Sequence, residues 1–158
     1  MPALREALTS AGFEDVRTYV QSGNIVLSSD ASPAALVADT ERLLAERFGL
    51  GVAVIARTRD ELAEVVRRNP LREVAVNPKR YQVSFLSAEP DPDVIDQCAA
   101  LAAPQERVVA IGREIYAWHP DGVARSRLWG RLAGGGLGVT GTARNWTTVT
   151  TLLATADE

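Results

Sequence analysis

The chain has 158 residues, of which 46% are hydrophobic and 23% charged, and its formal net charge is −3. This composition is typical of a folded globular protein and excludes a disordered chain, and no apolar run reaches the roughly 18 residues that a membrane span requires. The arginines are spread along the sequence, so the clustered positive charge that nucleic-acid binding needs is absent, and we expect neither a membrane nor a nucleic acid as partner.

The cysteine and histidine content limits the chemistry. The one cysteine, Cys98, cannot form an internal disulfide, and with one histidine, His119, the chain cannot build a zinc site of three histidines. We therefore expect no metal and no cofactor. The lone thiol and the lack of a signal peptide in the first residues indicate a cytoplasmic protein.

The first third of the chain alternates helical and strand-like patterns. The expected elements are a helix over residues 3–11 that ends at Gly12, hairpin strands over 16–20 and 25–27, a helix over 33–48 capped by Ser32 or Asp30, an apolar strand over 52–56, and a helix that begins at Thr58 and stops before Asn69–Pro70. Helical spacing of apolar residues, strand alternation and the positions of Gly and Pro carry these predictions.

The rest of the chain continues in the same style. The expected elements are a strand over residues 81–86, a helix from Pro92 to about Ala103, strands over 107–111 and 114–118 joined by Gly112–Arg113, a helix over 126–132, a flexible connection at 134–136 and a final helix over 145–156. The turn chemistry of Gly112 and the capping residue Asp91 support the hairpin and the helix.

The element order of residues 3–56 is that of a βαββαβ plait without its opening strand. We therefore predict an α+β fold of two α/β-plait (ferredoxin-like) subdomains, the first lacking its N-terminal strand. The predicted parts are a lobe over 1–57, a helix and connector over 58–80, and a second lobe with a C-terminal helix over 81–158. A sheet without one strand exposes unpaired backbone groups, so we expect an upstream strand or a strand borrowed from a neighbour.

Residues 140–148 bring together side chains suited to ligand contact. These candidate ligand-binding residues are Thr142, Arg144, Asn145, Trp146 and Thr147. A helix start has unpaired N–H groups and partial positive charge, so an adjacent guanidinium favours a polar or anionic ligand, with Trp146 as a stacking wall. The structural alternative is that Asn145 or Thr142 caps the helix, Trp146 packs internally and Arg144 pairs with a carboxylate.

Four residues outside this segment enter the functional hypotheses. Ser22 and Asn24 flank the expected hairpin turn and are candidate ligand contacts, although turn chemistry explains them better. An enzyme would need a nucleophile or base near Arg144, for which Ser22, Tyr19 and His119 are the candidates. No catalytic residue follows from the sequence.

Three separated motifs carry a family resemblance. They are Gly12–Phe13 with residues 16–24, then Asn69–Pro70–Leu71, and finally residues 142–149. Together they resemble the bacterial family catalogued as domain of unknown function 1697, over nearly the whole chain. The resemblance implies two α/β-plait subdomains and a soluble bacterial protein without an established activity. Family members usually begin with a strand and a Gly-rich loop, reading roughly A-L-L-R-G-I-N-V-G-G, which this chain does not contain.

These observations favour one function and leave two alternatives. We expect a small polar or anionic ligand to bind between the two plait lobes at the start of the last helix. The first alternative is an enzyme of unknown reaction class that uses the same cleft. The second is a homodimer, or a partner-binding module, that forms through an exposed sheet edge.

Overall fold

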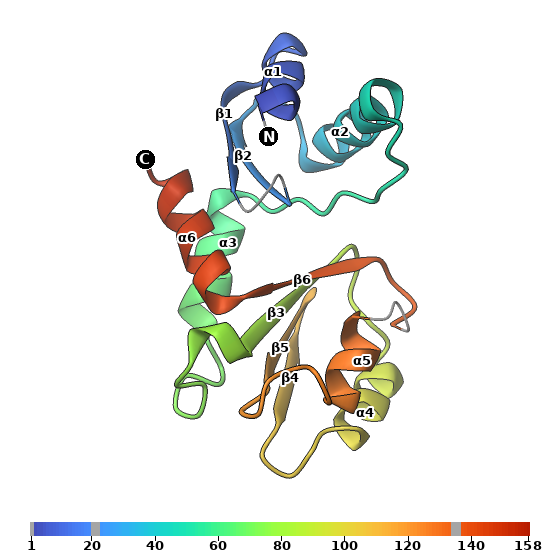
Figure 1. Cartoon of the computed structure of the whole chain (residues 1–158), viewed down its shortest axis with the longest axis vertical. Helices are drawn as coiled ribbons and strands as arrows, with labels where there is room; N and C mark the ends of the chain where they lie inside the picture. The colour runs from blue at the N-terminus through green and yellow to red at the C-terminus, as the bar shows by residue number, and fades with distance from the viewer. Residues whose placement is uncertain (1, 20–22, 134–136) are drawn as a thin grey trace. The chain divides into compact units, whose positions relative to one another are not determined.

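The computed structural model describes residues 2–19, 23–133 and 137–158, so the predicted turn residue Ser22 and the connection at 134–136 lie outside the described residues (Figure 1). The chain forms two compact units. The first unit contains residues 1–62 and 151–158, and the second contains residues 63–150. Two helices, α3 (Arg59–Arg68) and α6 (Trp146–Ala156), contribute residues to both units.

The first unit packs helices against a two-stranded hairpin. Its elements are α1 (Pro2–Ser10), β1 (Glu14–Tyr19), β2 (Asn24–Ser28) and α2 (Pro33–Phe48). β1 and β2 pair antiparallel, with an irregular register near Asp15, whose φ is +49°. The buried residues of the core are Leu4, Leu8, Val16 and Leu44. The predicted helix and hairpin patterns of this region are confirmed.

The ends of α2 and the start of α3 follow local sequence signals. The Ser32 hydroxyl accepts a hydrogen bond from the Ala35 N–H at 3.2 Å, and Gly49 ends α2 with a left-handed φ of +65°. Thr58 and Glu61 bond each other's backbone N–H groups at 2.8 and 3.1 Å, which forms a capping box at the start of α3. These contacts satisfy N–H groups that a helix start leaves unpaired.

The second unit is a complete plait. Its elements are β3 (Tyr81–Leu86), α4 (Pro92–Ala100), β4 (Arg107–Ile111), β5 (Glu114–Trp118), α5 (Arg127–Ala133) and β6 (Gly141–Asn145), preceded by a short 3-10 helix, η1 (Pro78–Arg80). All strand pairs are antiparallel and the order across the sheet is β4-β5-β3-β6. This is the βαββαβ arrangement of a ferredoxin-like plait.

Two predicted elements were wrong. Residues 52–56 form no strand, and residues 141–145, expected as the entry to the last helix, form strand β6 instead. The second unit shows why residues 52–56 form no strand. In that unit the last strand, β6, pairs only with the opening strand, β3. No strand precedes α1 among the described residues, so residues 52–56 have no equivalent partner there. Val54 still packs on the core of the first unit, whereas Val52 is 48% exposed.

The four-stranded sheet is covered on both faces. Helices α4 and α5 cover one face (Figure 1). The residues buried there include Leu86, Ile115 and Cys98, and burial raises the pKa of the Cys98 thiol. On the other face the Tyr116 hydroxyl donates to the Val65 carbonyl of α3 at 2.9 Å, and burial raises the pKa of Tyr116 to about 12. Aromatic side chains on this sheet therefore fill the interior and do not form an exposed stacking surface.

Asn69 connects α3 to this sheet and explains one of the family-like motifs. Its side-chain oxygen accepts a hydrogen bond from the Tyr81 hydroxyl at 2.9 Å. Its φ is +25°, a backbone conformation that Asn tolerates better than most residues, and Pro70 follows it. The Asn69–Pro70 pair thus ends α3 and fixes Tyr81.

We predict that Gly141→Ala destabilises the protein. A Cβ at Gly141 would lie 2.5 Å from Leu86 Cδ2 and 3.2 Å from the Phe85 carbonyl oxygen. Since Leu86 is fully buried, the crowding should lower the free energy of unfolding by about 1–3 kcal/mol, measured by chemical denaturation. The control is Gly130→Ala in α5, where an added Cβ would meet nothing within 4 Å. This substitution should stabilise the helix by about 0.5–1 kcal/mol. Equal stability of the two variants would contradict the prediction.

Candidate functional site

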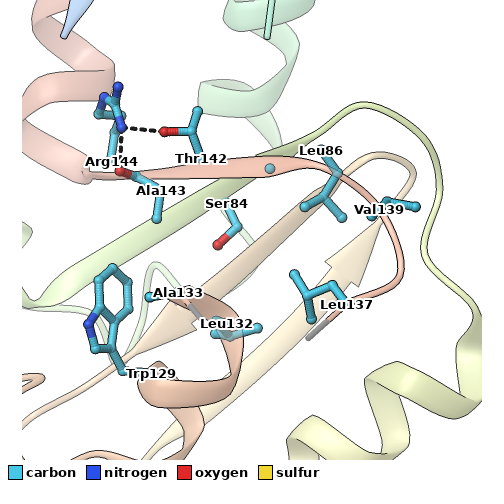
Figure 2. Close-up of a pocket in the computed structure, with 11 residues that line it drawn as sticks. Ser84, Leu86, Trp129, Leu132, Ala133, Leu137, Val139, Thr142, Ala143 and Arg144 are labelled. Carbon is cyan, nitrogen blue, oxygen red and sulfur yellow. Dashed lines mark hydrogen bonds between the residues drawn. The ribbon is translucent and has the colours of Figure 1, made fainter. Parts of the chain in front are cut away.

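A cavity of about 260 Å³ lies within the second unit, between α5 and the strands β3 and β6 (Figure 2). Most of the lining residues are apolar, but polar atoms make up almost as much of the lining surface as apolar atoms do. The lining residues are Ser84, Leu86, Trp129, Leu132, Ala133, Leu137, Val139, Gly141, Thr142, Ala143 and Arg144. Trp129 supplies a flat aromatic wall from α5, and Ser84 supplies a hydroxyl from the central strand β3.

The strand register decides which side chains of β6 face the cavity. Ala143 lies opposite Ser84, while Arg144 lies opposite Val83 and Thr142 opposite Phe85. Residues directly opposite each other on paired strands project to the same face of a sheet. Ala143 therefore points with Ser84 toward the cavity, and the Thr142 and Arg144 side chains point to the other face, as Figure 2 shows. We infer that Thr142 and Arg144 line the cavity through their backbone.

Ser84 is the notable polar group of the cavity. Ser84 as a whole is 3% exposed. Its hydroxyl has no hydrogen-bond partner among the described residues. The buried side-chain atoms without a hydrogen-bond partner in the described residues do not include the Ser84 hydroxyl oxygen, so this oxygen is accessible from the cavity. A ligand or water in the cavity can therefore bond it.

Arg144 folds back on its own strand. Its Nη1 donates to the Thr142 hydroxyl at 2.5 Å and to the Ala143 carbonyl at 2.8 Å. The side chain is half-buried, and burial lowers the pKa of the guanidinium. Thr142 and Arg144 are thus brought together as expected, but on the strand and not at the first turn of the helix.

The residues at the start of α6 have structural contacts. Asn145 accepts a hydrogen bond from the Thr148 N–H at 2.9 Å, so the expected capping role is confirmed. Trp146 stacks on Tyr81 with ring centroids 4.8 Å apart. The Thr147 carbonyl accepts a bond from the Thr150 hydroxyl at 3.1 Å. None of these three residues lines the cavity.

The remaining predicted site residues lie in the first unit or outside the described residues. Asn24 donates from its side chain to the Tyr19 carbonyl at 3.3 Å, which is a contact within the hairpin. Tyr19 belongs to β1 of the same unit. Ser22 lies outside the described residues.

A polar cluster that the sequence did not indicate lies beneath the start of α5. His119 is fully buried, and its Nδ1 lies 2.5 Å from Glu106 Oε2. The same carboxylate oxygen accepts a bond from the Ser126 hydroxyl at 2.6 Å, and Glu106 Oε1 accepts one from the Ala103 N–H at 2.9 Å. Burial alone would raise the pKa of Glu106, but these hydrogen bonds outweigh burial and lower it below 4.5.

This cluster does not have the geometry of a serine hydrolase. A nucleophilic serine bonds the His nitrogen opposite the one that faces the acid. Ser126 instead lies beside Nδ1, at 3.3 Å, on the side of the carboxylate. His119 Nε2 is buried and has no hydrogen-bond partner in the described part of the chain.

The described part of the chain contains neither a group of metal-binding side chains nor a membrane-spanning helix. Within residues 2–19, 23–133 and 137–158, no three metal-binding side chains are grouped closely enough to hold an ion. In the same ranges, no helix combines the length and the apolar character needed to cross a membrane.

Comparison with known sequences identifies the family. The family model described as "Protein of unknown function (DUF1697)" matches residues 1–116, which is most of the chain. The chain belongs to the DUF1697 family. The match covers the first two motifs and ends before the third, at residues 142–149. No curated protein matches this DUF1697 sequence significantly.

A solved structure supports the fold of the DUF1697 chain. A conserved bacterial protein from Streptococcus pneumoniae is similar to it with a TM-score of 0.73 and 23% sequence identity, over 99% of this chain and 88% of the other. At this identity the similarity concerns the fold. The α+β architecture therefore extends over the β6 and α6 region that the family match does not reach.

We predict that Asn145→Ala weakens the start of α6 in this DUF1697 protein. Loss of the bond to the Thr148 N–H should lower the free energy of unfolding by about 1 kcal/mol. Asn145→Asp keeps an acceptor oxygen and should retain most of the stability. Denaturation curves measure both, and an alanine variant as stable as the aspartate variant would contradict the capping role.

We predict that Glu106 contributes stability that disappears in acid. Because its pKa in the folded state is lowered from 4.5, the contribution is present above pH 4.5 and is lost as the pH falls through the folded-state pKa. The difference in unfolding free energy between wild type and Glu106→Gln should therefore shrink below pH 4.5. Denaturation at a series of pH values measures it, and a difference that grows toward acid would refute the assignment.

Proposed function

We propose that the second unit of this DUF1697 protein binds a small, mainly apolar molecule that carries one polar group, in the cavity beside β6. The observation that supports this function best is the Ser84 hydroxyl, which lines the cavity beside apolar side chains and has no hydrogen-bond partner among the described residues. Binding sites for small molecules typically combine apolar walls with a few polar groups that orient the ligand.

The size of the cavity limits the ligand. A volume of about 260 Å³ corresponds to roughly nine water molecules at about 30 Å³ each. This lies just below the pockets of about 300–1,000 Å³ that hold drug-sized molecules. The indole of Trp129 favours a flat ligand, because aromatic rings stack in offset or edge-to-face geometry. A single substituted ring fits these limits.

The polar group of the ligand should be neutral. The charged Arg144 side chain projects from the opposite face of β6 and bonds Thr142 and Ala143. The cavity offers the Ser84 hydroxyl and strand backbone, which bond a hydroxyl or amide without compensating a full charge. We therefore propose that the one polar group of the ligand is a neutral hydroxyl or amide, and place no anion in the cavity.

We predict that phenol binds the cavity and that Ser84 contributes to its affinity. Phenol and toluene are titrated separately while amide chemical shifts are recorded by NMR. Ser84→Ala should weaken phenol binding by about two- to tenfold, as expected for the loss of one hydrogen bond, and leave toluene binding unchanged. An equal loss for both compounds would show that the hydroxyl does not contact the ligand.

A matched pair of variants on β6 locates the site. Ala143→Leu places a larger side chain in the cavity and should abolish phenol binding. Thr142→Val changes the neighbouring residue on the opposite face and should retain it. If wild type binds neither compound at millimolar concentration, or if Ala143→Leu binds phenol as wild type does, the proposed function is wrong.

A further inference from the structure

We propose that Glu106 and His119 are positioning residues that fix Trp129, and with it one wall of the cavity. The part of this inference that concerns ligand affinity rests on the proposed function. Neither residue lines the cavity, so each would act through Trp129, which lines the cavity and also contacts His119.

The first connection runs through Ser126. Its hydroxyl oxygen accepts a hydrogen bond from the Trp129 N–H at 3.0 Å and so caps the first turn of α5. The same hydroxyl donates its proton to Glu106 Oε2 at 2.6 Å. One hydroxyl therefore joins the carboxylate directly to the backbone of Trp129, so the position of Glu106 determines where α5 begins.

The second connection runs through the imidazole ring. An ionised carboxylate only accepts hydrogen bonds, so the contact of 2.5 Å with Glu106 Oε2 places a proton on His119 Nδ1. That bond fixes the plane of the ring. The ring of Trp129 meets it edge-on, with centroids 5.8 Å apart and an interplanar angle of 81°. Rotation of the imidazole would remove this edge contact.

Burying these polar groups is energetically unfavourable, which argues that the cluster has a specific geometric role. His119 Nε2 is buried without a partner in the described residues, and such a group is unfavourable by about 1–3 kcal/mol. Apolar side chains would fill the same space without that cost, but they lack directional bonds. Carboxylate, imidazole and hydroxyl together define one orientation of α5 and of the Trp129 ring.

Magnetic resonance tests the positioning directly, because the chain contains one histidine and three tryptophans. Nitrogen shifts of the imidazole should report a proton on Nδ1 in wild type. In Glu106→Gln the side-chain amide can donate to Nδ1, which should move the proton to Nε2. In fluorotryptophan-labelled protein the Trp129 resonance, assigned with Trp129→Phe, should shift or broaden in Glu106→Gln. The Trp146 resonance should stay in place.

Two controls separate positioning from general destabilisation. Glu114→Gln alters another buried glutamate of the second unit, which pairs with Arg68, and should leave the His119 proton and the Trp129 resonance unchanged. Ser126→Ala breaks the link to α5 and should move the Trp129 resonance, whereas Ser126→Thr keeps a hydroxyl and should restore it. The serine pair decides the question if Glu106→Gln does not fold.

Ligand titration then measures the consequence for the cavity. Glu106→Gln and Ser126→Ala should weaken phenol binding by about fivefold or more, as expected for a misplaced wall, while Glu114→Gln retains wild-type affinity. Unchanged Trp129 resonances and phenol affinity in the first two variants would overturn the positioning role and leave the proposed function intact. If wild type binds no phenol, the proposed function fails, and the Trp129 and His119 signals alone decide the positioning role.

Discussion

The antiparallel pairing of β3 with β6 determines which side chains face the cavity. Its register sets Ala143 beside Ser84 and turns the Arg144 guanidinium to the opposite face. Because side chains alternate along a strand, a shift of one residue would exchange these two faces and bring the Arg144 guanidinium into the cavity. The close approach of Gly141 to Leu86 opposes such a shift, since few residues other than glycine fit that contact.

Strand pairing also explains why residues 52–56 of the first unit form no strand, whereas the second unit has a final strand, β6. In a plait the last strand depends on the first for all of its ladder hydrogen bonds, as β6 depends on β3. Residues 52–56 have the apolar, β-branched composition of a strand, yet they form none where no partner strand is described. Strand propensity alone is therefore insufficient, because a strand exists only with a neighbour that accepts and donates its backbone bonds.

Several helix ends follow from local sequence signals, whereas strand β6 and the contacts between separate elements do not. Ser32, Gly49 and Asp91 act within a few residues of their own helix, so their roles follow from spacing. The strand β6 was missed because Thr, Arg and Asn before a helix resemble a capping segment. The Glu106–His119 contact joins residues that are distant in sequence and meet only after the β4–β5 hairpin forms. Ser84 in β3 carries no sequence signal of its own, since its place beside a cavity depends on the tertiary fold.

The protonated, buried state of Cys98 has a practical consequence for spectroscopy. A thiol reacts with alkylating reagents as the thiolate, and this one is shielded from solvent and held in its neutral form. Since the chain has a single cysteine, a second one introduced at an exposed position would be modified selectively without first replacing the native residue. Dyes or spin labels can therefore be attached at chosen surface positions while the interior of the second unit keeps its natural packing.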